Sequence, residues 1–247
     1  MDIILTENVS FSYNHQTFIK GLRINIREGE FVGLIGPNGS GKSTVLKLAA
    51  GILRPDSGRV LLWGRDISTY NGKDRAKLIS YLPQMLNMKV PFKVSEIVRM
   101  GLYPYDIPPG QTPEEALHMV GLSEKKDAYI TELSGGERRR VYLAMTLLQG
   151  AGLLLLDEPL ANLDIRYQVD LLGLLRDLRD NKGISIFMAL HDIIQIEKFD
   201  RLYIIKEGNI IAEGSPEDII CDSLLSDLYG VNIRVIRDKD GGFLFRI

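Results

Sequence analysis

The chain has 247 residues, of which 45% are apolar and 25% are charged, and this is ordinary globular composition. The length fits one α/β domain, with or without a subdomain, whose core needs neither metals nor disulfides. Because the formal net charge is only −2, we expect no general attraction to nucleic acid and no nucleic-acid partner. The single cysteine, Cys221, cannot form an intrachain disulfide and suits a reducing compartment.

The sequence also lacks the patterns of secretion and membrane insertion. Its N-terminus has neither the basic start nor the apolar length of a signal peptide. No run of about 18 apolar residues predicts a transmembrane helix. We therefore expect any role at a membrane to depend on another polypeptide.

The first predicted elements are strands. Segments Ile3–Phe11 and Phe18–Ile26 alternate apolar with polar residues, which is typical of half-exposed antiparallel strands. Phe31–Ile35 is a short apolar run that ends at a glycine-rich loop, and Thr44–Ala50 predicts a helix after that loop. A phosphate site at a helix N-terminus requires a strand, a loop and a helix in this order.

The glycine-rich loop fits the nucleotide-binding pattern G-x-x-x-x-G-K-S/T. Its glycines let successive N–H groups point at phosphate oxygens. Lys42 supplies a positive charge for the β- and γ-phosphates, and the Ser43 hydroxyl can bind Mg²⁺. The alternative is a plain glycine-rich turn that ends in a helix cap, but the flanking strand and helix favour a nucleotide site. This predicted site comprises Gly36, Pro37, Asn38, Gly39, Ser40, Gly41, Lys42, Ser43 and Thr44.

Prolines then interrupt the pattern, and short helical stretches lie between them, which predicts a mostly helical inserted subdomain over 85–149. Strands and helices return after it, with apolar strands Leu153–Leu156 and Ile184–Leu190 on either side of an amphipathic helix, Tyr167–Arg179. Apolar strands that alternate with helices predict a parallel sheet buried on both faces. The C-terminal part predicts two hairpins and a capped helix start, formed by Leu202–Ile205 with Ile210–Ala212, by Ser215–Asp218, and by Ile233–Ile236 with Phe243–Ile247 joined around Gly241-Gly242.

Two acidic residues follow the apolar run Leu153–Leu156 directly. In an open parallel sheet, ligands bind outside the carboxyl ends of the strands. Asp157 is therefore expected beside the phosphate loop, where it can hold Mg²⁺, and Glu158 is expected to face the γ-phosphate and orient the attacking water. A polar strand end that begins a turn is the alternative, and the phosphate loop argues against it.

The segment Leu133-Ser134-Gly135-Gly136-Glu137 resembles the signature of ABC ATPases, with Glu in the last position. Ser134 and Glu137 also form the pattern S-x-x-E of a helix capping box, and the two interpretations are compatible because a capped helix start is an anion site. The segment lies 20 residues before Leu153 and is followed by three arginines. The resemblance covers essentially the whole chain.

The resemblance implies roles for further residues. Tyr13 matches the aromatic residue that stacks on adenine, and Gln84 matches a glutamine that contacts Mg²⁺ or water and links the core to the helical subdomain. Asp164 matches a residue of the loop that crosses to the partner subunit, and His191 matches the histidine that contacts the γ-phosphate. His15 and His118 have no such match.

The resemblance further implies a P-loop α/β fold, with an N-terminal antiparallel β subdomain, that works as a dimer with ATP and Mg²⁺. Residues 1–84 and 150–247 form the nucleotide-binding core, and 85–149 form the helical signature subdomain. Ser134, Gly135, Gly136 and Glu137 of one copy close on ATP bound by Lys42 of the other, while Glu158, His191 and Gln84 act in hydrolysis and Ser43, Gln84 and Asp157 bind the metal. The expected partners are a second copy, transmembrane permease subunits and, indirectly, a substrate-binding protein, at the cytoplasmic face of the membrane.

Three segments resemble the ATPase subunits of importers for iron–siderophore, haem and cobalamin, namely Ile79–Gln84, Gly101–Tyr105 and Asp227–Val231. Leu102 departs from that pattern, in which Arg commonly follows the glycine, and the segment Asp106–Glu115 is short and proline-rich by comparison. A soluble ABC ATPase of iron–sulfur cluster assembly, or a transporter ATPase for another cargo, remains an alternative. A DNA-repair ATPase would need a coiled-coil insertion, for which the 49 residues between Gln84 and Ser134 leave no room.

Overall fold

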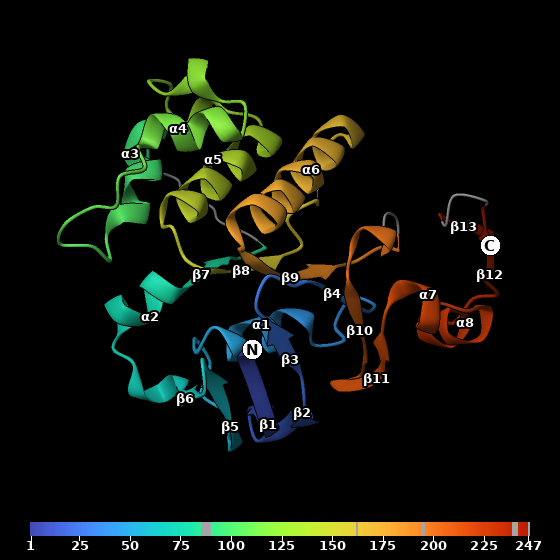
Figure 1. The fold of residues 1–247 in the computed structure, drawn as a ribbon. Coiled ribbons are helices and arrows are strands. Elements are labelled where there is room, and N and C mark those ends of the chain that lie inside the picture. Colours follow the sequence, from blue (N-terminus) through green and yellow to red (C-terminus); the bar gives the residue numbers. More distant parts are fainter. Residues whose placement is uncertain (85–89, 162, 194–195, 239–241, 247) are drawn as a thin grey trace. The chain divides into compact units, whose positions relative to one another are not determined.

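The computed structural model describes residues 1–84, 90–161, 163–193, 196–238 and 242–246 (Figure 1). The chain forms two compact units: unit 1 comprises Met1–Ser68 and Phe187–Ile247, and unit 2 comprises Thr69–Ile186. Unit 1 is thus built from both ends of the chain. The predicted helical subdomain lies inside unit 2, and its first residue, Met85, lies outside the described residues. Its boundaries at 85 and 149 stay a prediction.

The N-terminal sheet of unit 1 is antiparallel and centres on β1 (Asp2–Tyr13), which pairs with β2 (Gln16–Leu22), β3 (Asn25–Arg27) and β5 (Ser57–Leu62). Strand β6 (Arg65–Asp66) pairs with β5. The predicted strand Phe18–Ile26 is therefore two strands rather than one. At the break, the N–H of Ile24 donates to the Thr6 hydroxyl at 2.8 Å, so a side chain replaces the backbone partner.

The second sheet of unit 1 has the strand order β11-β10-β4-β9. Strands β4 (Phe31–Ile35) and β10 (Arg201–Lys206) run parallel, and β11 (Asn209–Gly214) forms an antiparallel hairpin with β10. Strand β9 (Ser185–Leu190) belongs to unit 1 from Phe187 onward. Every residue of β4 and β9 is buried, as expected for strands covered on both faces. Helix α1 (Lys42–Ala49) follows β4.

A buried arginine, Arg201, lies at the start of β10 in this sheet. Arg201 is 9% exposed, and its guanidinium pairs with both carboxylate oxygens of Glu30 at 2.7 and 2.8 Å. It also donates to Glu213 and, at 2.9 Å, to the hydroxyl of Tyr203, which is fully buried. Burial tends to lower the pKa of Arg201, but the hydrogen bonds that it donates to Glu30 and the nearby charges outweigh this effect, and the net shift is upward.

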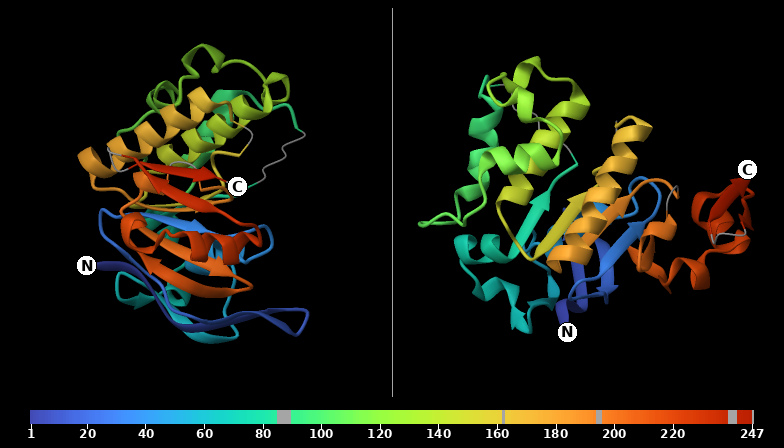
Figure 2. Two further views of the ribbon diagram at one scale, coloured as in Figure 1. Left: turned by 90° about the vertical axis from the view of Figure 1, so that its right-hand side faces the viewer. Right: turned by 45° about the horizontal axis from the view of Figure 1, so that its top comes forward.

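The C-terminal part of unit 1 contains α7 (Pro216–Ile219), α8 (Asp222–Tyr229) and the hairpin β12 (Arg234–Arg237) and β13 (Phe243–Arg246), coloured red in Figure 2. Ser215 caps α7, as the sequence predicts. The hairpin is tied to α8, because the Val235 N–H donates to Asp222 at 2.8 Å. The predicted turn residue Gly241 and the last residue, Ile247, lie outside the described residues.

Unit 2 holds most of the helices. Strands β7 (Ile79–Leu82) and β8 (Leu153–Asp157) pair in parallel, and α3 and α4 pack against α5. Its α-helices are α2 (Gly72–Leu78), α3 (Val94–Arg99), α4 (Pro113–Met119), α5 (Gly135–Leu148) and α6 (Ile165–Lys182). Short 3₁₀ turns lie at Met100–Leu102, Ser123–Lys125 and Ile130–Glu132 of this unit, at Ile67–Thr69 where the units join, and at Ile196–Lys198 of unit 1.

The helices of unit 2 begin and end where local chemistry dictates. Thr112 and Glu115 form a capping box at the start of α4, and Ser134 and Glu137 form one at the start of α5. Helix α6 ends at Gly183, which takes the left-handed conformation that glycine adopts without strain. Within the described residues, no helix combines the length and apolar character that crossing a bilayer requires.

Candidate nucleotide-binding and catalytic site

The phosphate loop of unit 1 connects the buried strand β4 to α1. Gly41 precedes the helix with φ = 112° and, as a glycine, has no side chain with which to cap α1. N–H groups at a helix start attract anions, because they lie at the positive end of the helix dipole. The local fold therefore presents the donors that the sequence pattern predicts.

The loop is also too tight for side chains where it turns. A Cβ atom on Gly36 would lie 2.3 Å from the carbonyl oxygen of Ile205 and 2.7 Å from the Ser40 hydroxyl. The Ser40 carbonyl accepts from the N–H of Gly208 at 2.9 Å, which ties the loop to the turn between β10 and β11. Among the described residues, the buried Ser40 hydroxyl has no hydrogen-bond partner, and such an atom is expected to meet a ligand or water. These features fit a bound triphosphate.

Lys42 is held inside the loop. It is only 4% exposed, and its ammonium donates to the carbonyl oxygens of Gly36 at 2.7 Å and Pro37 at 3.2 Å. Burial of a lysine is costly unless its donors are satisfied, so the loop carbonyls stabilise the charge where phosphates would bind. Ser43 follows it on the first turn of α1 and is half-buried.

Tyr13 lies beside the same helix turn. Its hydroxyl is 3.3 Å from the Thr44 hydroxyl, and its ring packs edge-on against Phe11 and Phe18. The side chain is 43% exposed, which leaves surface for a stacked base. Unit 1 thus brings together Tyr13 and the phosphate loop. His191, at the end of β9, is exposed, and its Nε2 lies 3.6 Å from the Asp192 carboxylate.

Unit 2 gathers the predicted catalytic carboxylates. Asp157 ends the buried strand β8 and is 1% exposed, and Glu158 is 7% exposed. The Gln84 amide donates to the Glu158 carboxylate at 2.6 Å, and the hydroxyl of Tyr81 donates to Asp157 at 3.2 Å. These contacts arise because β7, which carries Tyr81 and leads to Gln84, pairs with β8 in parallel. The structure therefore brings Gln84, Asp157 and Glu158 together.

Two residues near these carboxylates are absent from the sequence prediction. Tyr81 contacts Asp157, and Arg139 of α5 donates to the backbone carbonyls of Asp157 and Glu158. A signal for Arg139 does exist in the sequence, because it shares a buried helix face with Tyr142, Leu143 and Thr146 at a spacing of three, four and seven residues. A charged residue in such a stripe requires polar partners.

The predicted signature segment starts α5. Ser134 is exposed, its hydroxyl accepts from the N–H of Glu137 at 3.2 Å, and the Glu137 carboxylate accepts from the N–H of Ser134 at 2.9 Å. This confirms the predicted capping box. The hydrogen bond from the Ser134 N–H lowers the pKa of Glu137. Among the described residues, no atom lies within 4 Å of the position that a Cβ on Gly135 would take, so the backbone of Gly135 is open to an approaching group.

Asp164 precedes α6 and is exposed, and its side chain makes no capping hydrogen bond there. Two apolar residues one turn apart on α6 are also exposed, Ile165 at 78% and Val169 at 53%. Exposed apolar residues beside a polar loop are typical of a contact surface.

A magnesium ion also fits the donor set of these residues. The described part of the chain holds no cluster of three His, Cys, Asp or Glu side chains. Mg²⁺ in phosphate sites needs no such cluster, because it is held by one or two protein oxygens together with phosphates and water. Ser43 and Asp157 offer oxygens of the kind required. The predicted metal ligands thus have suitable chemistry.

Comparisons with known proteins place the chain in a family. The family described as "ABC transporter" matches residues 19–161. The chain is 34% identical to the petrobactin import ATP-binding protein of Bacillus anthracis, with 98% of this chain and 92% of that protein covered. It is 37% identical to a hemin import ATP-binding protein of Rhodopseudomonas palustris, with 95% and 91% covered.

Solved structures agree. A metal-chelate type ABC transporter in an inward-facing conformation superposes with a TM-score of 0.82 at 25% identity, covering 99% of this chain and 96% of that one. A dimeric bacterial ABC transporter cassette superposes with a TM-score of 0.77 at 26% identity, covering 86% and 98%. Both the sequence relatives and these structures span nearly the full length of the chain. The chain therefore belongs to the ABC transporter family and is one of its ATP-binding subunits, which are ATPases.

Proposed function

We propose that this ATPase powers an importer for a metal chelate or haem, and that it does so as a head-to-tail dimer beneath permease subunits. The observation that carries the catalytic part is the 2.6 Å hydrogen bond from Gln84 to Glu158 beside the buried Asp157. A glutamine and two carboxylates at the end of a buried parallel strand suit the metal binding and water activation that ATP hydrolysis needs.

In this proposal the phosphate loop binds the triphosphate and Tyr13 stacks on the base. Lys42 moves from the loop carbonyls to the β- and γ-phosphates. Ser43, Gln84 and Asp157 would hold Mg²⁺, which would neutralise charge on the phosphates. Glu158 orients the attacking water and accepts its proton, and His191 contacts the γ-phosphate. Hydrolysis then depends mainly on positioning and electrostatics, as in other phosphoryl transfers.

The second copy supplies the other side of the site. Ser134 and Gly135 are exposed at the start of α5, and a capped helix N-terminus is still an anion site, so this segment with Gly136 suits the γ-phosphate of ATP bound to the partner. Asp164, with the exposed Ile165, is proposed to contact the partner as well. One ATP molecule then contacts both copies, whereas ADP lacks the γ-phosphate and contacts only the copy whose phosphate loop holds it. Hydrolysis therefore shifts the equilibrium from the closed dimer to the open one.

Permease contact is proposed for the segment 92–107 of unit 2, whose exposed apolar side chains, named here the exposed apolar surface of unit 2, are Phe92, Met100, Tyr103 and Ile107. These side chains are 37%, 39%, 79% and 88% exposed. Exposed apolar patches on soluble domains mark interaction sites. A permease at this surface would place the subunit peripherally at the cytoplasmic face of the membrane.

The cargo is proposed from the relatives, whose names specify petrobactin and hemin import, and from the metal-chelate type of a similar solved structure. A permease and a substrate-binding protein would select this cargo. The soluble iron–sulfur assembly ATPase is the competing function, because it would share the nucleotide site. The exposed apolar surface of unit 2 favours the permease.

Affinity purification of the full chain from its own cells tests the choice. We expect a polytopic membrane protein to co-purify, and a double variant, Tyr103→Ala with Ile107→Ala, to lose it while keeping ATP binding. Ile211→Ala, at a residue of unit 1 that is 41% exposed, serves as the matched control and should retain the partner. Recovery of soluble scaffold proteins, with no membrane protein, would contradict the proposal.

A further inference from the structure

Arg139 is a buried, hydrogen-bonded charged side chain of α5. It is 9% exposed, and the four atoms that accept its hydrogen bonds are all backbone carbonyl oxygens. Its Nη1 donates to Pro83, at 2.7 Å, and to Gln84. Its Nη2 donates to Asp157 at 2.6 Å and to Glu158 at 3.0 Å. One guanidinium therefore joins the segment after β7 to the segment after β8.

The identity of these carbonyls matters. The carbonyls of Pro83 and Gln84 belong to the two peptide planes that meet at the Cα of Gln84. The carbonyls of Asp157 and Glu158 belong to the two planes that meet at the Cα of Glu158. Because a peptide group is planar, holding both planes at one Cα fixes φ and ψ of that residue. Each terminal nitrogen of Arg139 thus sets the backbone direction of one residue, and these are the two whose side chains meet at 2.6 Å.

Glu158 needs such support. Its φ is +49°, in the left-handed region that residues with a Cβ rarely adopt. A backbone of this kind persists only where its surroundings hold it. Besides Arg139, the N–H of Ala161 donates to the Glu158 carbonyl at 3.1 Å. Only Arg139 bonds the carbonyls on both sides of the Glu158 Cα among the hydrogen bonds described for this part of the chain.

We infer that Arg139 is a positioning residue for hydrolysis, which aims the Gln84 and Glu158 side chains by fixing the backbone of both. This rests on the proposed roles of those two residues. The planar guanidinium matters for the task, because its two terminal nitrogens serve both segments at once. A lysine ammonium is a compact charge and cannot reproduce that fork. Since Ser134 is the N-cap of α5, the same helix connects the signature segment to the proposed catalytic carboxylate of Glu158.

The test compares Arg139→Met and Arg139→Lys with the unchanged full chain. A misplacement of reacting groups by about 1 Å costs about 100-fold in rate, so we expect kcat to fall by about this factor in Arg139→Met. ATP affinity and KM should stay close to normal, since the four carbonyls that accept from Arg139 all belong to unit 2, whereas the phosphate loop and Tyr13 belong to unit 1. Arg139→Lys should restore thermal stability but not kcat, which separates positioning from folding.

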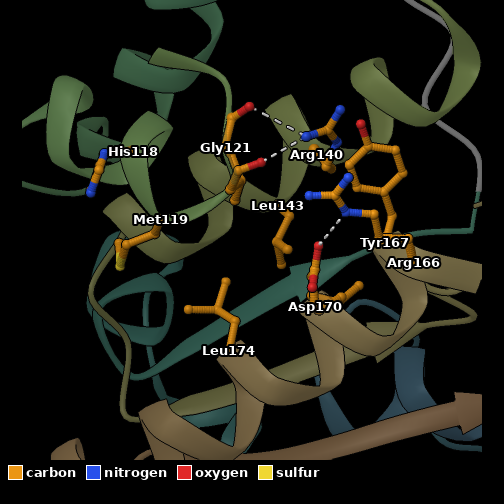
Figure 3. Close-up of a pocket in the computed structure, with 11 residues that line it drawn as sticks. His118, Met119, Gly121, Arg140, Leu143, Arg166, Tyr167, Asp170 and Leu174 are labelled. Carbon is orange, nitrogen blue, oxygen red and sulfur yellow. Dashed lines mark hydrogen bonds and ion pairs between the residues drawn. The ribbon is translucent and has the colours of Figure 1, made fainter.

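The neighbouring Arg140 provides a matched control on the same helix. It also donates to two carbonyls, those of Val120 at 3.0 Å and Gly121 at 3.4 Å, and its guanidinium lies 4.1 Å from the ring centroid of Tyr167 (Figure 3). These partners lie at the end of α4 and on α6, and neither Gln84 nor Glu158 is among them. Arg140→Met should therefore lower the unfolding temperature and leave kcat unchanged.

A double variant sharpens the inference. If Arg139 acts through Gln84 and Glu158, then adding Arg139→Met to Gln84→Ala should reduce kcat by less than the product of the two single losses. A full product would overturn the inference. So would a normal kcat in a folded Arg139→Met or Arg139→Lys protein, or a loss in which ATP affinity falls as much as kcat.

The outcomes separate this inference from the proposed function. Normal turnover in Glu158→Gln would remove the catalytic role of Glu158 and the inference with it. Normal turnover in the Arg139 variants, with Glu158→Gln inactive, would remove the inference alone. If Arg139→Met does not fold, Arg139→Lys carries the test, because it keeps a positive charge and part of the hydrogen bonding.

Discussion

Unit 1 and unit 2 each bury an arginine, but the two side chains have different partners. Arg201 of unit 1 pairs with the carboxylates of Glu30 and Glu213, and those charges raise its pKa despite burial. Within the part of the chain that the structure describes, Arg139 of unit 2 donates only to carbonyl oxygens, and burial lowers its pKa although the charges of Asp157 and Glu158 act against the shift. The partners of Arg201 come from strands and turns of the unit 1 core, whereas those of Arg139 flank residues of the proposed catalytic set.

A buried charge can therefore either stabilise the fold or position residues for hydrolysis. A carboxylate that neutralises a buried guanidinium satisfies its charge, and the pair then has a role in the fold alone. Carbonyl partners instead let the guanidinium hold backbone segments and leave the carboxylates of Asp157 and Glu158 to other groups. We expect variants at Arg201 to change stability and variants at Arg139 to change the rate.

The largest predicted effect on stability is that of Arg201→Met. Removal of one partner from a buried pair leaves the other charge uncompensated and costs about 3–5 kcal/mol. Urea unfolding should show this loss, while kcat per folded molecule stays normal. Arg23→Met, at an exposed arginine of the same unit, should change the free energy of unfolding by less than about 0.5 kcal/mol. A selective loss of kcat in Arg201→Met would break the comparison between the two arginines.

The second prediction compares two tyrosines of unit 1, the fully buried Tyr203 and the half-buried Tyr229. The Tyr203 hydroxyl accepts from Arg201 and lies 3.1 Å from Glu213, whereas the Tyr229 hydroxyl has no partner among the described residues. Tyr203→Phe should cost about 1–3 kcal/mol because buried partners lose a hydrogen bond. Tyr229→Phe should be neutral or stabilising. Chemical denaturation of both variants measures this, and equal losses would show that the Arg201 network adds nothing at Tyr203.

The same residues predict a dependence on alkaline pH. Burial raises the pKa of Tyr203 to about 12 and that of Tyr229 to about 12, from an ordinary value of about 10. A pKa that is higher in the folded state means that the neutral hydroxyl is favoured there. This contribution is complete below pH of about 10 and is lost as pH rises toward about 12. Between about pH 10 and 12, the free energy of unfolding should fall less steeply with pH in Tyr229→Phe than in the unchanged chain. An unchanged slope would contradict the raised pKa of Tyr229.

The smallest predicted effect concerns the stacked pair of Arg140 and Tyr167. Cation–π contacts at partly exposed sites contribute about 0.5–1 kcal/mol, so Tyr167→Leu should reduce the free energy of unfolding by about that much. The ATPase rate should not change. Thermal unfolding, with Tyr129→Leu at another partly exposed tyrosine of unit 2 as control, checks the value. A larger loss of rate than of stability would mean that this pair, too, affects the site.

Elements with strong local chemistry were predictable from the sequence. The strand, loop and helix around Gly41, the buried strand before Asp157 and the capping box of Ser134 and Glu137 all follow from short patterns, and the structure confirms these elements. Phosphate binding by the loop stays a prediction. Boundaries were less exact. Helix α1 begins at Lys42, two residues before the predicted start, because the left-handed Gly41 lets the helix begin directly after it.

Features that depend on contacts between distant segments were not predictable. The division of the second strand follows from the Thr6 side chain, which bonds to the backbone 18 residues away. The hydrogen bonds of Arg139 reach two residues that lie 55 and 56 positions before it and two that lie 18 and 19 positions after it. No local pattern specifies which carbonyls such a side chain meets. Its place on a buried helix face indicates only that it needs partners.

One measurement tests the proposed shared site most directly: light scattering of Glu158→Gln with ATP and Mg²⁺. We expect a dimer that retains ATP and hydrolyses it at least about 100-fold more slowly than the unchanged chain. The dimer should disappear when Ser134→Arg is added, with ATP affinity of the monomer largely intact. A Glu158→Gln protein that stays monomeric and turns over ATP normally would contradict the account.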